Sequence, residues 1–136
     1  MKSILQIFIL FVSFGSVVFA NEFREVKEIS LKKDETKKIL VKYDSKERLF
    51  KFRWTLYKNN GLVVLRSYDK IVAQNILYMR HKNRSFRLEL KTRGLDFYNV
   101  PYLLVRFKEF KYDTKEAVFE LLLSDISSKI ELKYLN

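Results

Sequence analysis

The chain has 136 residues, of which 27 are Lys or Arg and 16 are Asp or Glu, so its formal net charge is +11. It contains no Cys, one His and three Gly, which excludes disulfide bonds, thiolate metal sites and glycine-rich phosphate loops. Aromatic residues make up 15% of the chain, and such a composition is typical of a folded core and not of a disordered polymer.

Residues 1–20 have the pattern of a secretory signal peptide. Lys2 provides a short positive start, an apolar run covers 4–14, and Val18-Phe19-Ala20 forms the cleavage site. We expect cleavage after Ala20, which leaves one all-β domain at 21–136 in the periplasm or secreted, with no membrane span. The alternative is an uncleaved N-terminal helix that anchors the protein, although the run is shorter than the ~20 apolar residues of a typical span.

Strands are predicted at 25–31 and 37–43. In the first, the apolar residues change phase near Lys27, which indicates a bulge or a strand that begins only at Glu25. In the second, every other residue is apolar, namely Ile39, Val41 and Tyr43. A period of two places these three side chains on one face of a strand.

A β-hairpin at 49–68 is predicted to supply the largest side chains of the core. Its first strand alternates polar residues with Phe50, Phe52, Trp54 and Leu56. Asn60-Gly61 predicts a two-residue type I′ turn, because both central residues of that turn need positive φ. This turn would pair Leu56 with Leu65 and Trp54 with Ser67. A three-residue turn is the alternative, and it would place Arg66 beside Trp54.

The second half of the chain predicts further strands. The pattern at 71–79 is weak, so we expect a connecting loop that leads into a short strand at 76–80. A half-buried strand is predicted at 86–91 and a long loop at 92–101. The strand at 102–111 is expected to contain a bulge near Lys108, where the apolar residues change parity. Segment 117–124 is apolar on both faces, which is typical of a central strand, and a last strand is predicted at 130–134.

These elements predict a single all-β domain of about eight antiparallel strands. The spacing of strands and turns favours a β-sandwich of immunoglobulin-like architecture. A small closed β-barrel is the alternative.

The sequence predicts no catalytic site, no metal site and no cofactor. His81 is the only histidine and lies between the cations Arg80 and Lys82, which is a poor setting for a catalytic base. A zinc site needs several His or Cys ligands, and the chain does not supply them. We therefore expect that the protein is not an enzyme.

Two segments are candidates for function. One is a cluster of cations whose side chains suit phosphate or carboxylate ligands: Arg80, Lys82, Arg84 and Arg87. The other is the long loop, because loops of this length in compact domains are often functional. Its candidate residues are Arg93, Asp96, Phe97 and Tyr98.

The positive charge favours an anionic partner. We expect a non-enzymatic binding or structural module of the cell envelope that contacts anionic envelope components or an acidic protein, and nucleic acid is disfavoured for an exported chain. The alternative is a small-ligand carrier with an apolar cavity lined by aromatic residues: Phe50, Phe52, Trp54 and Phe107. No oligomeric state is predicted.

Overall fold

The computed structural model describes residues 23–80, 82–91, 100–127 and 129–135. In these ranges the chain forms nine strands and no helix: β1 (Glu25–Lys32), β2 (Lys37–Tyr43), β3 (Lys46–Lys58), β4 (Gly61–Tyr68), β5 (Ile71–Tyr78), β6 (Ser85–Glu89), β7 (Tyr102–Lys111), β8 (Glu116–Ser124) and β9 (Glu131–Leu135). The described residues thus include no helix that could cross a membrane. The predicted signal peptide lies outside the described residues.

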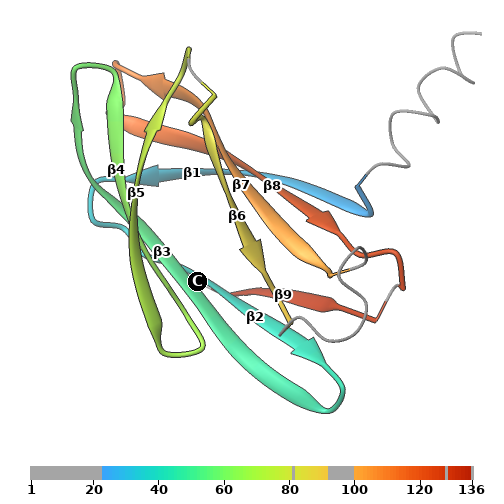
Figure 1. The fold of residues 1–136 in the computed structure, drawn as a ribbon. Helices are drawn as coiled ribbons and strands as arrows, with labels where there is room; N and C mark the ends of the chain where they lie inside the picture. Colours follow the sequence, from blue (N-terminus) through green and yellow to red (C-terminus); the bar gives the residue numbers. More distant parts are fainter. Residues whose placement is uncertain (1–22, 81, 92–99, 128, 136) are drawn as a thin grey trace, which may run out of the picture.

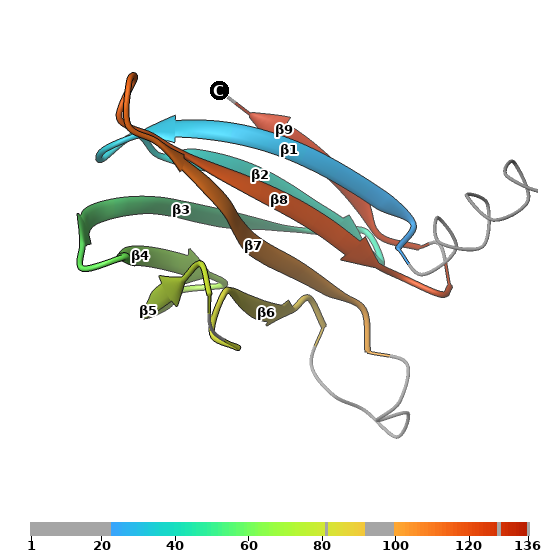
Figure 2. The same cartoon turned by 90° about the horizontal axis from the view of Figure 1, so that it is seen from above.

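The strands form two antiparallel sheets that pack face to face (Figures 1 and 2). One sheet has four strands in the order β1-β8-β7-β6, and the other has five in the order β5-β4-β3-β2-β9. The predicted antiparallel β-sandwich is therefore confirmed. Strand pairing stops at β5 and at β6, so the described residues form two open sheets and not the closed barrel considered as the alternative.

The core lies between the two sheets and is dominated by aromatic rings. Phe52 in β3 stacks on Phe50 and meets Phe119 of the opposite sheet edge-on, each with 5.3 Å between ring centroids. The four side chains suggested above as the lining of a ligand cavity are all buried and in contact with other rings: Phe50, Phe52, Trp54 and Phe107. β8 lies between β1 and β7 and is buried on both faces, which confirms that it is a central strand.

The turn between β3 and β4 differs from the prediction. Its central residues are Asn59 and Asn60, with φ of 54° and 63°, so Lys58 pairs with Gly61. Gly61 is needed for packing instead, because a Cβ atom there would come within 2.9 Å of the Tyr78 ring. Both predicted registers of the hairpin are therefore wrong.

A β-bulge changes the phase of β3 near its end. The register shifts between Trp54, which pairs with Val64, and Leu56. Beyond the shift Leu56 is 48% exposed, whereas Tyr57 stacks on Phe110 of the other sheet with 4.1 Å between ring centroids. The predicted burial of alternate residues in this strand is thus wrong at Leu56, because the extra residue exchanges the inner and outer faces.

Segment 71–79 is a full strand and not the predicted loop with a short strand at its end. β5 pairs with β4 along its whole length, from Gly61 with Tyr78 to Tyr68 with Ile71. A tight turn with positive φ at Asp69 and Lys70 joins the two strands. β5 is an edge strand, so it does not need the strict alternation that made the other strands recognisable.

The Tyr134 hydroxyl in β9 is buried and has no hydrogen-bond partner among the described residues. Burial, and secondarily the charge of Glu25, raise the pKa of Tyr134 to about 12, from the ordinary value of 10.0. A raised tyrosine pKa favours the folded state below pH 10.0, and this contribution is lost as the pH rises to about 12.

Tyr134→Phe should therefore increase the free energy of unfolding by about 1 kcal/mol at pH 7, because it removes an unpaired buried hydroxyl. The difference in the free energy of unfolding between the variant and the parent should grow between pH 10 and 12, where tyrosine ionises in the unfolded state and Tyr134 does not ionise in the folded state. Urea unfolding of both proteins at pH 7 and pH 11 measures this difference. A variant less stable than the parent at both pH values would contradict the prediction.

Candidate functional site

The structure places the four cations of the predicted cluster in different surroundings. Arg80 and Lys82 are exposed in the connection between β5 and β6. Arg87 lies on the outer face of the four-stranded sheet, with its guanidinium carbon 3.7 Å from the centre of the Tyr102 ring. Only Arg80 and Lys82 therefore remain neighbours on an exposed connection.

Arg84 binds the backbone of the neighbouring strand β7. Its Nε donates to the carbonyl oxygen of Phe107 at 2.8 Å, and its Nη2 donates to that of Lys108 at 2.9 Å. The register of β7 shifts between Phe107 and Glu109, which confirms the predicted bulge near Lys108. The Arg84 guanidinium thus satisfies carbonyl groups that the bulge leaves outside the regular ladder.

The other predicted site residues lie outside the described residues. They are Arg93, Asp96, Phe97 and Tyr98 of the long loop. His81, for which no role is predicted, also lies outside the described residues. Within the described ranges, no group of three or more His, Asp or Glu side chains is placed to hold a metal ion.

The outer face of the four-stranded sheet pairs cations with carboxylates. Arg106 in β7 contacts Glu120 in β8 at 2.6 Å, and Lys108 in β7 contacts Glu28 in β1 at 2.8 Å. The hydrogen bond that Lys108 donates to the Glu28 carboxylate raises the pKa of Lys108. Arg106 and Lys108 are therefore locally neutralised by carboxylates of the neighbouring strands.

The outer face of the five-stranded sheet has cations without such partners. Lys38 in β2 and Lys51 in β3 are directly opposite each other in the register, and Arg53 follows two positions along β3. All three are exposed, and none forms a salt bridge within the described part of the chain. Like charges directly opposite each other destabilise a sheet, so this arrangement has a cost that the fold alone does not explain.

Carboxylates are nearly absent from the three strands at this edge of the sheet. β4 and β5 contain no Asp or Glu. The only carboxylate of β3 is Glu47 at its start, where it pairs with Lys42 at 3.7 Å. The positive charge of Lys51 and Arg53 is therefore not balanced by neighbouring strands.

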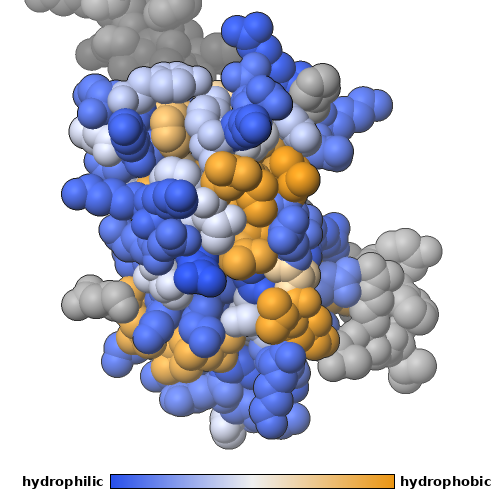
Figure 3. All heavy atoms as spheres, turned by 90° about the vertical axis from the view of Figure 1, so that its left-hand side faces the viewer, coloured by the Kyte–Doolittle hydropathy of each residue, from blue (hydrophilic) through white to orange (hydrophobic). Residues whose placement is uncertain are grey.

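Apolar side chains continue the same face across β4 and β5. The register aligns Val63 with Leu56 on one side and with Ile76 on the other, and it aligns Ser67 with Val72. Val72 is 75% exposed and Ile76 is 44% exposed. In Figure 3, where the side of the molecule with β3, β4 and β5 faces the viewer, hydrophobic side chains gather between hydrophilic ones.

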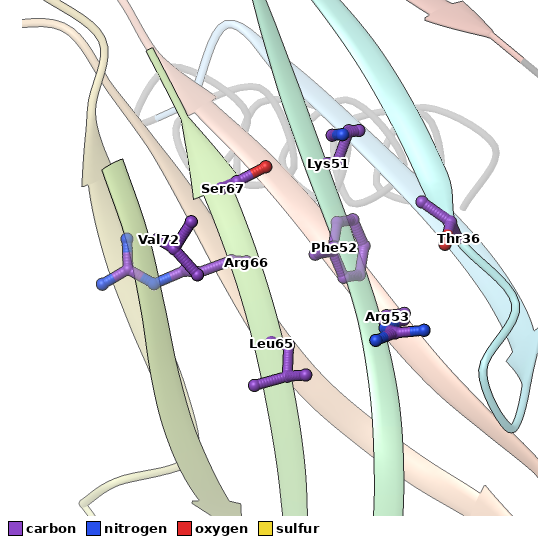
Figure 4. A pocket seen from close by; sticks show the side chains of 8 residues that line it. All are labelled: Thr36, Lys51, Phe52, Arg53, Leu65, Arg66, Ser67 and Val72. Carbon is purple, nitrogen blue, oxygen red and sulfur yellow. The ribbon is translucent and has the colours of Figure 1, made fainter. Parts of the chain in front are cut away.

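We call this surface the basic face, and it consists of Lys38, Lys51, Arg53, Leu56, Val63, Leu65, Ser67, Val72, Gln74 and Ile76. An open hollow of about 310 Å³ lies on it (Figure 4). The hollow is lined by Thr36, Lys51, Phe52, Arg53, Leu65, Arg66, Ser67 and Val72. The face therefore combines ammonium and guanidinium groups with exposed apolar surface around a shallow depression.

Arg66 is among the residues that line the hollow, but its guanidinium points toward the second sheet. Its Nε donates to Oδ1 of Asn75 at 2.7 Å, and its guanidinium carbon lies 4.6 Å from the centre of the Phe86 ring. Burial lowers the pKa of Arg66 from its ordinary value, although a guanidinium stays charged at neutral pH. Its guanidinium thus lies on the inner side of β4 and is not one of the cations of the basic face.

The cations of the basic face are not recognisable as a group in the sequence, because Lys38 and Lys51 meet only through the register of two strands. One signal could have indicated them: no Asp or Glu occurs in residues 48–68. The chain matches no protein-family model, no curated protein and no solved structure.

Proposed function

We propose that this protein is an exported, non-enzymatic binding module of the cell envelope, and that its basic face contacts an anionic surface or an acidic protein. The observation that supports this function is the difference between the two outer faces. Arg106 and Lys108 of the four-stranded sheet each have a carboxylate partner, whereas Lys38, Lys51 and Arg53 of the five-stranded sheet have none among the described residues.

Export is part of the proposal and is inferred from the signal peptide expected at 1–20. In the periplasm or outside the cell, lipid head groups, envelope polymers and acidic proteins are the available anions. We also propose that the likeness to immunoglobulin domains is one of architecture only, since β2 to β5 and β6 to β8 pair mainly with their neighbours in the chain.

The chemistry of the basic face suits an interface that is both anionic and partly apolar. Each Lys or Arg near an anionic lipid surface contributes about 1 kcal/mol of attraction, so three cations contribute about 3 kcal/mol. Val72, Ile76 and Leu56 would add to this if their exposed surface were buried in the contact.

Reversing the three charges should abolish most of the binding. We expect the triple variant Lys38→Glu, Lys51→Glu, Arg53→Glu to bind vesicles of phosphatidylcholine and phosphatidylglycerol, or poly-L-glutamate, at least about 100-fold more weakly. Sedimentation with vesicles, and fluorescence titration with poly-L-glutamate, separate the two kinds of partner. A control with the same change in net charge is Lys32→Glu, Lys46→Glu, Lys129→Glu, at exposed positions away from the basic face. Equal losses in the two triple variants would contradict a specific role for this face.

The single variant Lys51→Glu separates binding from folding. It replaces a like-charge pair with a cross-strand attraction between Lys38 and the introduced carboxylate, so the free energy of unfolding should rise by about 0.2–1 kcal/mol. Binding to anionic vesicles should weaken in the same protein. An increase in both binding and stability would show that the charge of Lys51 does not contribute to the contact between the basic face and an anionic surface.

A further inference from the structure

A second hollow lies at one end of the sandwich, where three connections meet. They are the β3–β4 turn, the connection after β5 and the β7–β8 turn (Figure 1). The hollow has a volume of about 450 Å³ and is lined by Tyr57, Asn59, Asn60, Tyr78, Met79, Arg80, Glu109, Phe110 and Tyr112. None of these residues belongs to the basic face.

Aromatic rings from both sheets form one side of this hollow. Tyr57 stacks on Phe110 with 4.1 Å between centroids and 17° between planes, and Phe110 meets the Tyr112 ring edge-on at 5.1 Å. Tyr112 is 70% exposed, so part of its ring surface is open to solvent. The cluster therefore presents ring surface to a molecule that could enter the hollow.

The two tyrosines in this cluster are joined by their hydroxyl groups, which are 3.1 Å apart. Burial, and then the hydrogen bond with Tyr112, raise the pKa of Tyr57 to about 12. The Tyr57 hydroxyl therefore remains protonated at neutral pH. One of the two hydroxyls donates to the other, which leaves the second proton free to point toward a ligand.

The polar groups of the hollow balance each other in charge. Arg80 is its cation and Glu109 its carboxylate, and the amides of Asn59 and Asn60 offer neutral donors and acceptors. This composition differs from the basic face, where the cations have no carboxylate beside them. A phosphate or another strong anion would meet repulsion from Glu109, so a neutral polar ligand fits better.

We propose that this hollow binds a pyranose ring of a neutral oligosaccharide. A pyranose has an apolar C–H face that packs on an aromatic ring, and a rim of neighbouring hydroxyls. Carboxylate, guanidinium and amide groups can each bind two such hydroxyls at once. The hollow provides the ring surface on one side and these three kinds of polar group around it. The site is independent of the proposed anion contact.

The test is a titration of the isotope-labelled full chain with three neutral probes, chitotetraose, cellotetraose and maltotetraose, followed by amide chemical shifts. We expect shifts at 57–60 and 109–112 with at least one probe at millimolar concentration. Tyr112→Ala should weaken that binding at least about tenfold, and Tyr112→Phe, which keeps the ring, should weaken it much less. Because Tyr112 is 70% exposed, neither change should disturb folding.

Tyr102→Ala is the matched control, since it removes a ring under Arg87 on the outer face of the four-stranded sheet. Its affinity should equal that of the parent protein. The proposal is overturned if none of the three probes shifts these amides, or if Tyr112→Ala and Tyr102→Ala bind equally well.

Discussion

Replacing Phe52 with Ala is expected to lower the free energy of unfolding by about 3–5 kcal/mol. Phe52 is 1% exposed and contacts aromatic rings of both sheets, Phe50 within its own strand and Phe119 in β8. Its removal leaves a cavity at the centre of the sandwich that the surrounding rings fill only in part. Domains of this size are stable by about 5–15 kcal/mol, so a large share of the total would be lost.

Leu56→Ala is the control for this prediction, because Leu56 belongs to the same strand and its side chain is also large and apolar. The bulge in β3 leaves it 48% exposed, so its truncation should cost less than about 1 kcal/mol. Urea unfolding of the two variants measures both values. Similar losses of unfolding free energy at Phe52 and Leu56 would contradict the exchange of inward and outward side chains in β3 after Trp54.

Replacing Asp125 with Ala should cost about 3 kcal/mol of unfolding free energy. The Asp125 carboxylate, whose side chain is 1% exposed, accepts from the Ile130 amide at 2.8 Å and from the Ser127 hydroxyl at 2.9 Å. It also accepts from Nη1 of Arg24 at 3.2 Å. The Ala variant leaves the buried Ile130 amide without its acceptor and removes one partner of the Arg24 guanidinium, and a buried amide is unfavourable to leave unpaired.

Asp125→Asn is the matched variant, because its amide oxygen can still accept from the Ile130 amide while the charge is lost. It should lose clearly less stability than Asp125→Ala. Thermal and urea unfolding of both variants provide the comparison. A loss below about 1 kcal/mol for Asp125→Ala would show that water replaces the carboxylate.

The periodicity of the sequence predicted those parts of the fold in which the residues of a single strand determine which of its side chains are buried. The alternation in β2, the two apolar faces of β8 and the bulge near Lys108 all follow from side chains that must be buried. The β3–β4 turn was not predictable in this way. Asn59-Asn60 and Asn60-Gly61 both suit a type I′ turn, and the choice depends on Gly61 fitting against the Tyr78 ring, a contact between distant residues.

The candidate site was less predictable than the fold, because its residues come together only through strand register. Lys38 and Lys51 do not stand out in the sequence and become a like-charge pair only when β2 pairs with β3. Arg84 has a structural role that its sequence position does not reveal. Its Nε and Nη2 donate to the carbonyl groups of Phe107 and Lys108 beside the bulge in β7.

The pairing of β1 with β8 has a consequence for the order in which the protein folds. β2 to β5 can close as successive hairpins as soon as each has been synthesised, whereas β1 has no partner until β8 follows. Contacts between distant segments form slowly. The apolar side of the five-stranded sheet therefore stays uncovered until late in synthesis, and exposed apolar surface of this kind is prone to aggregation.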